Sequence, residues 1–124
     1  MPRLYANGVY LFLVELVETS VFTRQITALL SDEEYLRFQY QLAANPEIGS
    51  VIKGGGGIRK IRVAVGSRGK SGGARVIYYW AVREDLILLL YVYPKNVAAN
   101  LTPKQIAQLA KVVKEEFGNE SEDV

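Results

Sequence analysis

The sequence predicts a single α+β domain: a strand and two helices, then a three-stranded antiparallel meander and a C-terminal helix. Two patterns and the chain length predict this class. Apolar residues recur at helical spacing after Thr19, Ser31 and Thr102, whereas they alternate or run together in strand-length segments between residues 58 and 93. The chain has 124 residues, which suits one domain with one modest core.

The N-terminal part is expected to hold the first strand, Leu11–Glu18, which is apolar and rich in β-forming residues. The preceding stretch, Met1–Gly8, contains Pro and Gly, and we predict no regular element in it. We assign residues 1–124 to one domain, with an N-terminal extension at 1–10 and a frayed acidic tail at 118–124.

Two helices are predicted next from their capping residues. Thr19 or Ser20 can cap the first helix. Ser31 begins the second, and Glu34 three positions later completes a capping box. Asn45-Pro46 ends the second helix, because the residue before a proline is driven out of the helical region. The apolar stripes of the two helices are Phe22, Ile26, Leu29 and Leu30, followed by Tyr35, Phe38 and Leu42.

Three strands follow the glycine run Gly54–Gly57, which we expect to form a flexible connection. The predicted strands are Ile58–Val65, Ala74–Val82 and Leu86–Tyr93, joined by a loop at 66–73 and a short turn at 83–85. The third strand is apolar on both faces, which favours a central position in the sheet. Thr102 then caps a final amphipathic helix, and Pro103 occupies its first turn.

Composition excludes several classes of protein. The chain has no Cys and no His, so it can form no disulfide, no zinc cage and no thiol nucleophile, and it lacks the usual near-neutral acid/base residue. The apolar run Val9–Val17 is broken by Glu15 and is too short to cross a bilayer. Because no secretory signal pattern is visible either, we expect a cytoplasmic protein with no membrane partner.

Charge is distributed unevenly along the chain. Seven cations and no acid lie between Lys53 and Arg75, whereas the remaining residues carry a net charge of −5. This concentration is typical of a surface that binds nucleic acid or an acidic partner. The segment 66–71 reads GSRGKS, but a strand rather than a helix is predicted after it, which disfavours a phosphate-binding loop of the nucleotide-hydrolysing type.

The basic residues are expected to meet on one surface of the sheet. Alternation places Lys60 and Arg62 on one face of their strand, Arg75 begins the next strand, and Lys95 ends the last one. Tyr91 and Tyr93 share the face of Lys95, where aromatic rings beside cations can stack an RNA base. Tyr78 and Trp80 fall on the face opposite Arg75 and are expected to pack in the core.

The run from Ser31 to Asn96 resembles the HigB-type branch of the RelE/ParE toxin superfamily. The resemblance rests on SDEEYLRFQ, the Asn-Pro-x-x-Gly turn at 45–49, GGGGIRKIRVA, GKSGGARVIYYW and YVYPKN. It implies a small RelE-like domain and a toxin of a type II toxin–antitoxin system that cleaves mRNA in a ribosome-dependent manner. Several RelE members place a catalytic tyrosine shortly after the last strand. Residues 96–101 hold no Tyr, so Tyr93 or Tyr91 is expected to substitute.

The resemblance implies a set of site residues. The expected catalytic residues are Lys60, Arg62, Lys70, Arg75, Lys95 and Tyr93. The basic and aromatic pattern of the same region, rather than the resemblance, adds the expected RNA-binding residues Lys53, Arg59, Arg68 and Tyr91. RNA supplies its own nucleophile, the 2′-hydroxyl, so no metal or other cofactor is expected. Lys60 or Lys70 would act as the general base, because neighbouring cations favour loss of a lysine proton while Arg stays charged. Arg62 and Arg75 would clamp the phosphate, and Lys95 would protonate the leaving 5′-oxygen.

Two other functions stay open from the sequence. One is a ParE-like toxin that inhibits DNA gyrase and cleaves nothing, and the other is a plain RNA-binding module. The expected partners are a cognate antitoxin, of the helix-turn-helix DNA-binding kind, together with the ribosome and mRNA. Operator DNA would be contacted only through the antitoxin.

Overall fold

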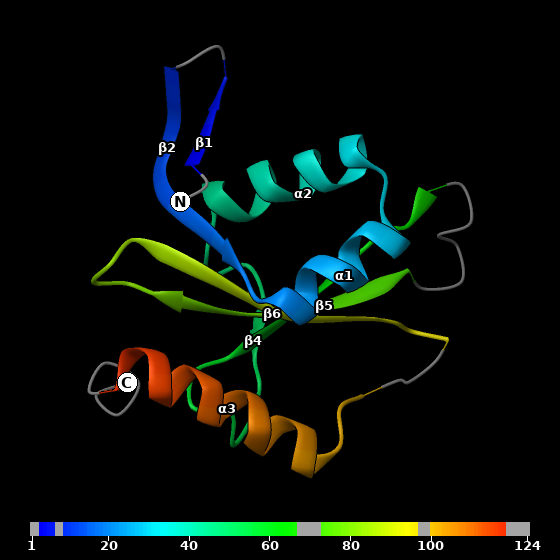
Figure 1. The fold of residues 1–124 in the computed structure, drawn as a ribbon, viewed down its shortest axis with the longest axis vertical. Helices are drawn as coiled ribbons and strands as arrows, with labels where there is room; N and C mark the ends of the chain where they lie inside the picture. Colours follow the sequence, from blue (N-terminus) through cyan, green and yellow to red (C-terminus); the bar gives the residue numbers. More distant parts are fainter. Residues whose placement is uncertain (1–2, 7–8, 67–72, 97–99, 119–124) are drawn as a thin grey trace.

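The computed structural model describes residues 3–6, 9–66, 73–96 and 100–118, with side chains from residue 14 onward. Its centre is a six-stranded sheet, covered on one face by helices α1 (Ser20–Leu29) and α2 (Asp32–Ala44) and on the other by α3 (Pro103–Phe117) (Figure 1). This arrangement confirms the predicted α+β class. No helix in the described part of the chain combines the length and apolar character needed to cross a membrane.

The strand order in the sheet is β1-β2-β6-β5-β4-β3. Only the β2–β6 pair is parallel among the pairs described, and the other neighbours are antiparallel. The predicted meander corresponds to β4, β5 and β6, and β6 is central as expected. The strand bounds are β1 Arg3–Ala6, β2 Val9–Glu18, β3 Ser50–Val51, β4 Arg59–Val63, β5 Ala74–Ala81 and β6 Leu86–Pro94.

The structure corrects the sequence prediction at two strands. The first predicted strand begins at Val9 rather than Leu11, and it pairs with β1, which lies in the stretch where no element was predicted. The short strand β3 pairs with β4 through Ser50 and Val51 and was also missed. The two missed strands, β1 and β3, are short and are defined by their pairing with a neighbour, so their own sequences hold too few residues to show a period of two.

The helix boundaries follow the predicted caps. The side chain of Thr19 accepts the Phe22 N–H at the start of α1, and the Ser31–Glu34 capping box begins α2. Thr102 caps α3 and forms a second capping box with Gln105, and the Lys60–Asn100 hydrogen bond holds the residues just before α3 against β4. These caps satisfy amide groups that the first helical turn leaves without partners.

Two apolar clusters hold the three layers together. On the face of α1 and α2, Phe22, Leu42 and Tyr78 are fully buried. On the face of α3, Ile77 and Val113 are fully buried. Strand β6 contributes to both clusters, which explains why both of its faces are apolar.

Tyr78 also anchors the turn that follows α2. Its hydroxyl accepts the Gly49 N–H at 2.9 Å and donates to the Pro46 carbonyl at 2.7 Å. A Cβ at Gly49 would lie 2.8 Å from the Tyr78 ring, so only glycine fits there without a shift. The predicted core position of Tyr78 is therefore confirmed, and the Asn-Pro-x-x-Gly turn has a packing reason.

Candidate functional site

A row of three side chains crosses the sheet on the face that α3 partly covers. Arg62 of β4 is the cross-strand partner of Arg75 of β5, and Arg75 is the partner of Tyr93 of β6. Directly paired residues point to the same face. Adjacent strands lie about 4.8 Å apart, so the backbones of the first and third residues are about 10 Å apart. The three residues are therefore neighbours on one face of the sheet.

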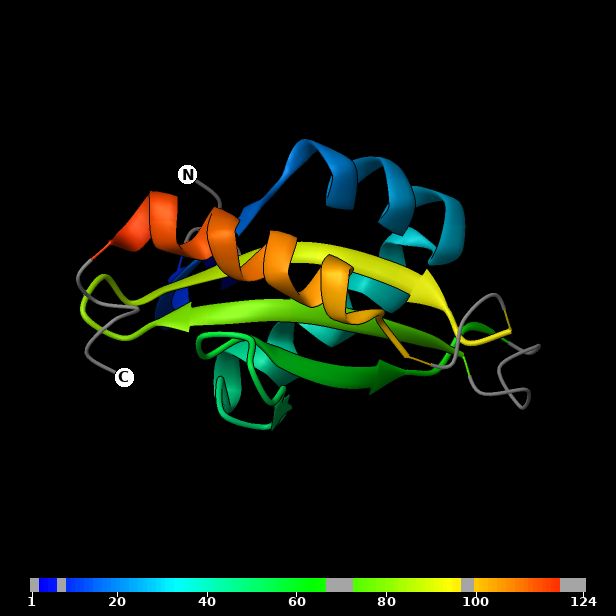
Figure 2. The ribbon, with the colours of Figure 1, turned by 90° about the horizontal axis from the view of Figure 1, so that it is seen from below.

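A second row lies two residues along the same strands. Lys60 pairs with Ile77, and Ile77 pairs with Tyr91. The Tyr91 and Tyr93 rings are neighbours, with centroids 6.0 Å apart and planes tilted by 38°. The strand register therefore brings together Lys60, Arg62, Arg75, Tyr91 and Tyr93. Their strands β4, β5 and β6 lie side by side beneath α3 (Figure 2).

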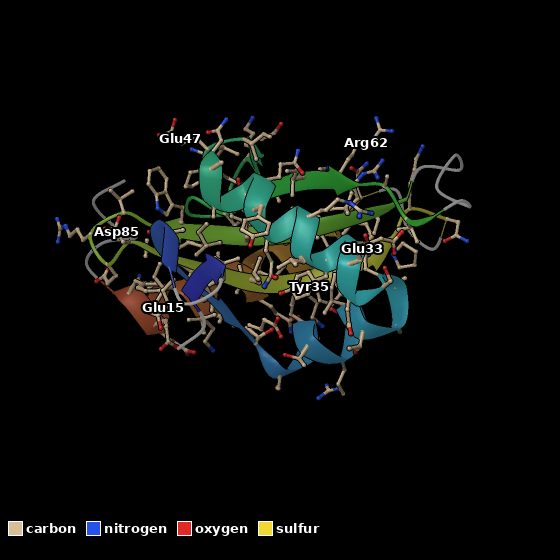
Figure 3. The ribbon with its side chains drawn as sticks, turned by 90° about the horizontal axis from the view of Figure 1, so that it is seen from above. Glu15, Glu33, Tyr35, Glu47, Arg62 and Asp85 are labelled. Atoms are coloured by element: carbon tan, nitrogen blue, oxygen red, sulfur yellow. The ribbon has the colours of Figure 1, made fainter. Side chains whose placement is uncertain are left out.

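Burial divides the two rows into a floor and a rim. Arg75 is only 9% exposed and Tyr93 only 5% exposed, so they form the floor. Lys60 and Tyr91 are half-buried, and Arg62 is exposed at the outer edge of the sheet, where it points away from the core (Figure 3). A guanidinium held at low exposure keeps a stronger field than one in water, because the surrounding medium screens it less.

Tyr93 is suited to donating a hydrogen bond. Burial raises the pKa of the Tyr93 phenol above its usual value, and the nearby Arg75 guanidinium offsets only part of that rise. Its hydroxyl is buried and has no hydrogen-bond partner in the part of the chain that the structure describes. A phenol with a raised pKa stays protonated near neutral pH, so Tyr93 is not a general base.

Lys95 is placed at the end of β6, beside the start of β5. Its backbone N–H donates to the Gly73 carbonyl at 3.0 Å, and its side chain is exposed. Gly73 has φ +59°, and a Cβ there would collide with the Val63 carbonyl oxygen. Glycine at this position therefore fixes where the loop before β5 ends. The loop residues Arg68 and Lys70, both predicted site residues, lie outside the described residues.

Arg59 lies on the opposite face of the sheet from the other site candidates. It pairs with Tyr78, and its guanidinium donates to the carbonyls of Glu47 at 3.1 Å and Gly49 at 2.8 Å. The expected RNA-binding role grouped Arg59 with its neighbours by charge alone. Strand alternation separates it from Lys60, and its hydrogen bonds make it a structural residue that holds the turn after α2.

Sequence reasoning missed Asn100. The Lys60 ammonium donates to the Asn100 side-chain oxygen at 3.0 Å, and both residues line a cavity of about 250 Å³. The exposed side chain of Lys53 also lines this cavity, whose other lining residues are Ile52, Leu101 and Ile106. The only sequence signal for Asn100 is its place two residues before the Thr102 cap, which says nothing of Lys60.

The rim cations are not neutralised within the described parts of the chain. Among those residues, the one salt bridge joins Arg37 to Glu33 on α2, and it includes none of the cations Lys53, Lys60, Arg62 and Lys95. Within the same ranges, no three side chains of His, Cys, Asp or Glu gather in a way that could hold a metal ion. The face is therefore a set of fixed positive charges and hydrogen-bond donors, which suits an anionic ligand.

Comparison with known proteins identifies the family. Residues 20–124 match the family model described as the RelE toxin of the RelE/RelB toxin–antitoxin system. The chain belongs to the RelE family. The HigB-type branch within the wider superfamily stays a prediction.

Solved RelE structures share this fold at low sequence identity. The free E. coli toxin RelE, in a mutant form, matches with a TM-score of 0.54 and 12% identity, over 81% of this chain and 96% of that chain. RelE in the intact E. coli RelBE toxin–antitoxin complex matches with a TM-score of 0.53 and 16% identity, over 65% of this chain and 95% of that chain. At these identities, the match supports the fold of this RelE family member and not its individual site residues.

Proposed function

We propose that this RelE family toxin is a ribosome-dependent endoribonuclease that cleaves mRNA and thereby stops translation. The observation that supports this best is the alignment of Arg62, Arg75 and Tyr93 across three strands, with Lys60 beside them. RNA cleavage by the 2′-hydroxyl needs the backbone held in line and the extra negative charge on phosphorus stabilised. Fixed cations at the spacing of this row meet both needs.

The role proposed for each residue depends on how deeply its side chain is buried in the site. Arg75 lies at the floor, and Arg62 lies at the rim on the neighbouring strand, so the two can bind the phosphate from two sides. Guanidinium groups are suited to this because they stay charged and present several donors to phosphate oxygens. Tyr93 supports the floor beside Arg75 with its hydroxyl buried, and Tyr91, which is half-buried, offers a ring for stacking a base.

Cleavage in this scheme requires two proton transfers. The 2′-oxygen forms a bond to phosphorus and loses its proton to the proposed base, Lys60 or Lys70. The bond from phosphorus to the 5′-oxygen breaks, and that oxygen takes a proton from Lys95. The products are a 2′,3′-cyclic phosphate and a 5′-hydroxyl, and no metal enters the scheme. Lys60 lies on the same face of β4 as Arg62, and Lys95 lies at the end of the strand that carries Tyr93.

The toxin is proposed to be held inactive by a cognate antitoxin with an acidic segment. RelE in one matched E. coli structure is bound in a RelBE toxin–antitoxin complex. The exposed cations Lys53, Arg62 and Lys95 would attract such a segment as they attract RNA. The antitoxin is proposed to carry the helix-turn-helix that binds operator DNA. Its association rate should fall steeply with salt, and a rate that is flat from low to high salt would remove electrostatic steering from the proposal.

Primer extension in cells that produce the toxin alone tests the proposed activity. Cuts should appear in a translated reporter message and vanish when its start codon is removed. Cuts that persist in the untranslated message would refute ribosome dependence. An intact message together with gyrase-linked DNA damage would support the ParE-like alternative instead.

A further inference from the structure

A second binding feature adjoins the proposed cleavage site. It is the cavity of about 250 Å³ between the β3–β4 connection and the start of α3. Its floor is apolar and comes from Ile52, Leu101 and Ile106, whereas Lys53, Lys60 and Asn100 supply its polar groups. Lys60 belongs to both places, because it lies on the β4 face with Arg62 and donates to Asn100. A ligand in the cavity therefore lies next to the cations of the proposed cleavage site.

The size and chemistry of the cavity suit one nucleobase. Pockets for drug-sized ligands are usually about 300–1,000 Å³, so this cavity is small for a whole nucleotide and large enough for a single ring system. Apolar side chains can pack against the faces of a base, and a few polar groups can form hydrogen bonds with its edge. The two lysines at the rim can bind the phosphates on either side of that base.

We propose that this cavity binds the base of a nucleotide adjacent to the scissile phosphate, with Asn100 reading its edge. The inference rests on the proposed RNA-cleaving function and adds a specificity-determining residue to it. An acidic peptide would satisfy the lysines but would leave the flat apolar floor and the amide unused. The combination of floor, amide and two ammonium groups therefore favours a nucleotide.

The hydrogen bond from Lys60 sets which bases Asn100 prefers. Lys60 Nζ donates a hydrogen bond to the Asn100 amide oxygen at 3.0 Å, so the NH₂ group of the amide is left for a ligand. Paired recognition of adenine by Asn needs the amide to donate and accept together. Guanine and uracil present carbonyl oxygens to these donors, whereas adenine accepts only through a ring nitrogen and leaves its own NH₂ group without an acceptor. The site should therefore prefer guanine or uracil to adenine.

Nuclear magnetic resonance titration of the ¹⁵N-labelled full chain tests the proposal without cleavage. The ligands are the 5′-monophosphates of guanosine, uridine and adenosine, together with ribose 5-phosphate as the probe that lacks a base. The guanosine and uridine nucleotides should shift the Asn100 side-chain NH₂ signals saturably, with adenosine monophosphate about fivefold weaker, the effect of about one hydrogen bond. Ribose 5-phosphate should leave those signals nearly unchanged.

Two variants complete the test. Asn100→Ala should remove the preference among the bases, whereas Gln108→Ala, which removes an exposed amide from a different cavity, should keep it. The proposal is overturned if ribose 5-phosphate shifts the Asn100 signals as the nucleotides do, if none of the ligands shifts them, or if Asn100→Ala keeps the base preference. Message cleavage by the wild type is measured separately. Cleavage without base binding would reject this cavity and leave the proposed function standing.

Discussion

Replacing Arg75 by Met separates catalysis from folding. Arg75 is 9% exposed and lies between Arg62 and Tyr93 in the row across the sheet. In the proposed mechanism it stabilises charge that develops on the phosphate. Loss of one such preorganised donor reduces the rate by about 10²–10³-fold. Met keeps most of the buried side-chain volume, and replacement of buried ionic groups by apolar residues of similar volume is often close to neutral for stability, so we expect a change within about 1 kcal/mol.

The matched control is Arg59→Met, three positions from Arg62 on the same strand. The Arg59 guanidinium makes two hydrogen bonds to the carbonyls of Glu47 and Gly49 on the opposite face. Losing these charged donors should cost about 2 kcal/mol of the free energy of unfolding. With about 2.1 cal/mol/K of unfolding entropy per residue over 124 residues, this lowers the Tm by about 8 °C. Cleavage at 25 °C should be unchanged.

The assay compares the two variants in a purified translation system, with message cleavage measured at 25 °C and unfolding followed by circular dichroism. Arg75→Met should lose cleavage and keep the wild-type Tm, whereas Arg59→Met should keep cleavage and have a lower Tm. Wild-type cleavage by Arg75→Met would refute the role of the three-residue row. Loss of cleavage by folded Arg59→Met would refute the assignment of the active face.

Three further predictions concern the parts of the fold that position the site. Tyr78→Phe should lower the free energy of unfolding by about 2 kcal/mol, because it leaves the buried Gly49 N–H without its acceptor; a chemical denaturation midpoint equal to that of Tyr91→Phe would contradict this. Gly73→Ala should slow message cleavage at a temperature where the variant is still folded, because φ +59° and the Val63 carbonyl leave no space for a Cβ where the loop meets β5. Cleavage by the folded variant at the wild-type rate would show that the end of the loop is not critical. Burial and the hydrogen bond to Glu18 raise the pKa of Tyr35, so the contribution of the Tyr35 phenol to the free energy of unfolding is present below about pH 10 and is lost as the pH rises further. If wild type and Tyr35→Phe show the same dependence of Tm on pH between pH 9 and about pH 11, this contribution of Tyr35 is refuted.

Local patterns predicted most of the fold. The caps Thr19, Ser31 and Thr102 set the starts of the three helices, because capping is decided within a few residues. The apolar character of β6 on both faces indicated its central place. The β1–β2 hairpin and the parallel pairing of β2 with β6 were not predicted, since they depend on partners that local periodicity does not reveal.

The candidate site was predicted in part. Alternation placed Lys60 and Arg62 on one face, and the structure brings Arg75, Tyr91 and Tyr93 to that face as expected. Arg59 was misassigned because charge was counted without regard to its position in the strand.

Two features of the site lay beyond local patterns. Asn100 was missed because its contact with Lys60 spans 40 residues. The depth of Tyr93 follows from packing between β6 and its neighbours, which the sequence of one strand does not reveal.

The most direct test of the central claim is cleavage of a message that lacks a single 2′-hydroxyl. A message on purified ribosomes is first cut by the toxin, and the position of one strong cut is mapped. The same message is then prepared with 2′-deoxyribose on the 5′ side of that phosphate. This cut should disappear, cuts elsewhere should remain, and the normal message should yield 2′,3′-cyclic phosphate ends. A cut that persists at the deoxyribose position would contradict attack by the 2′-hydroxyl.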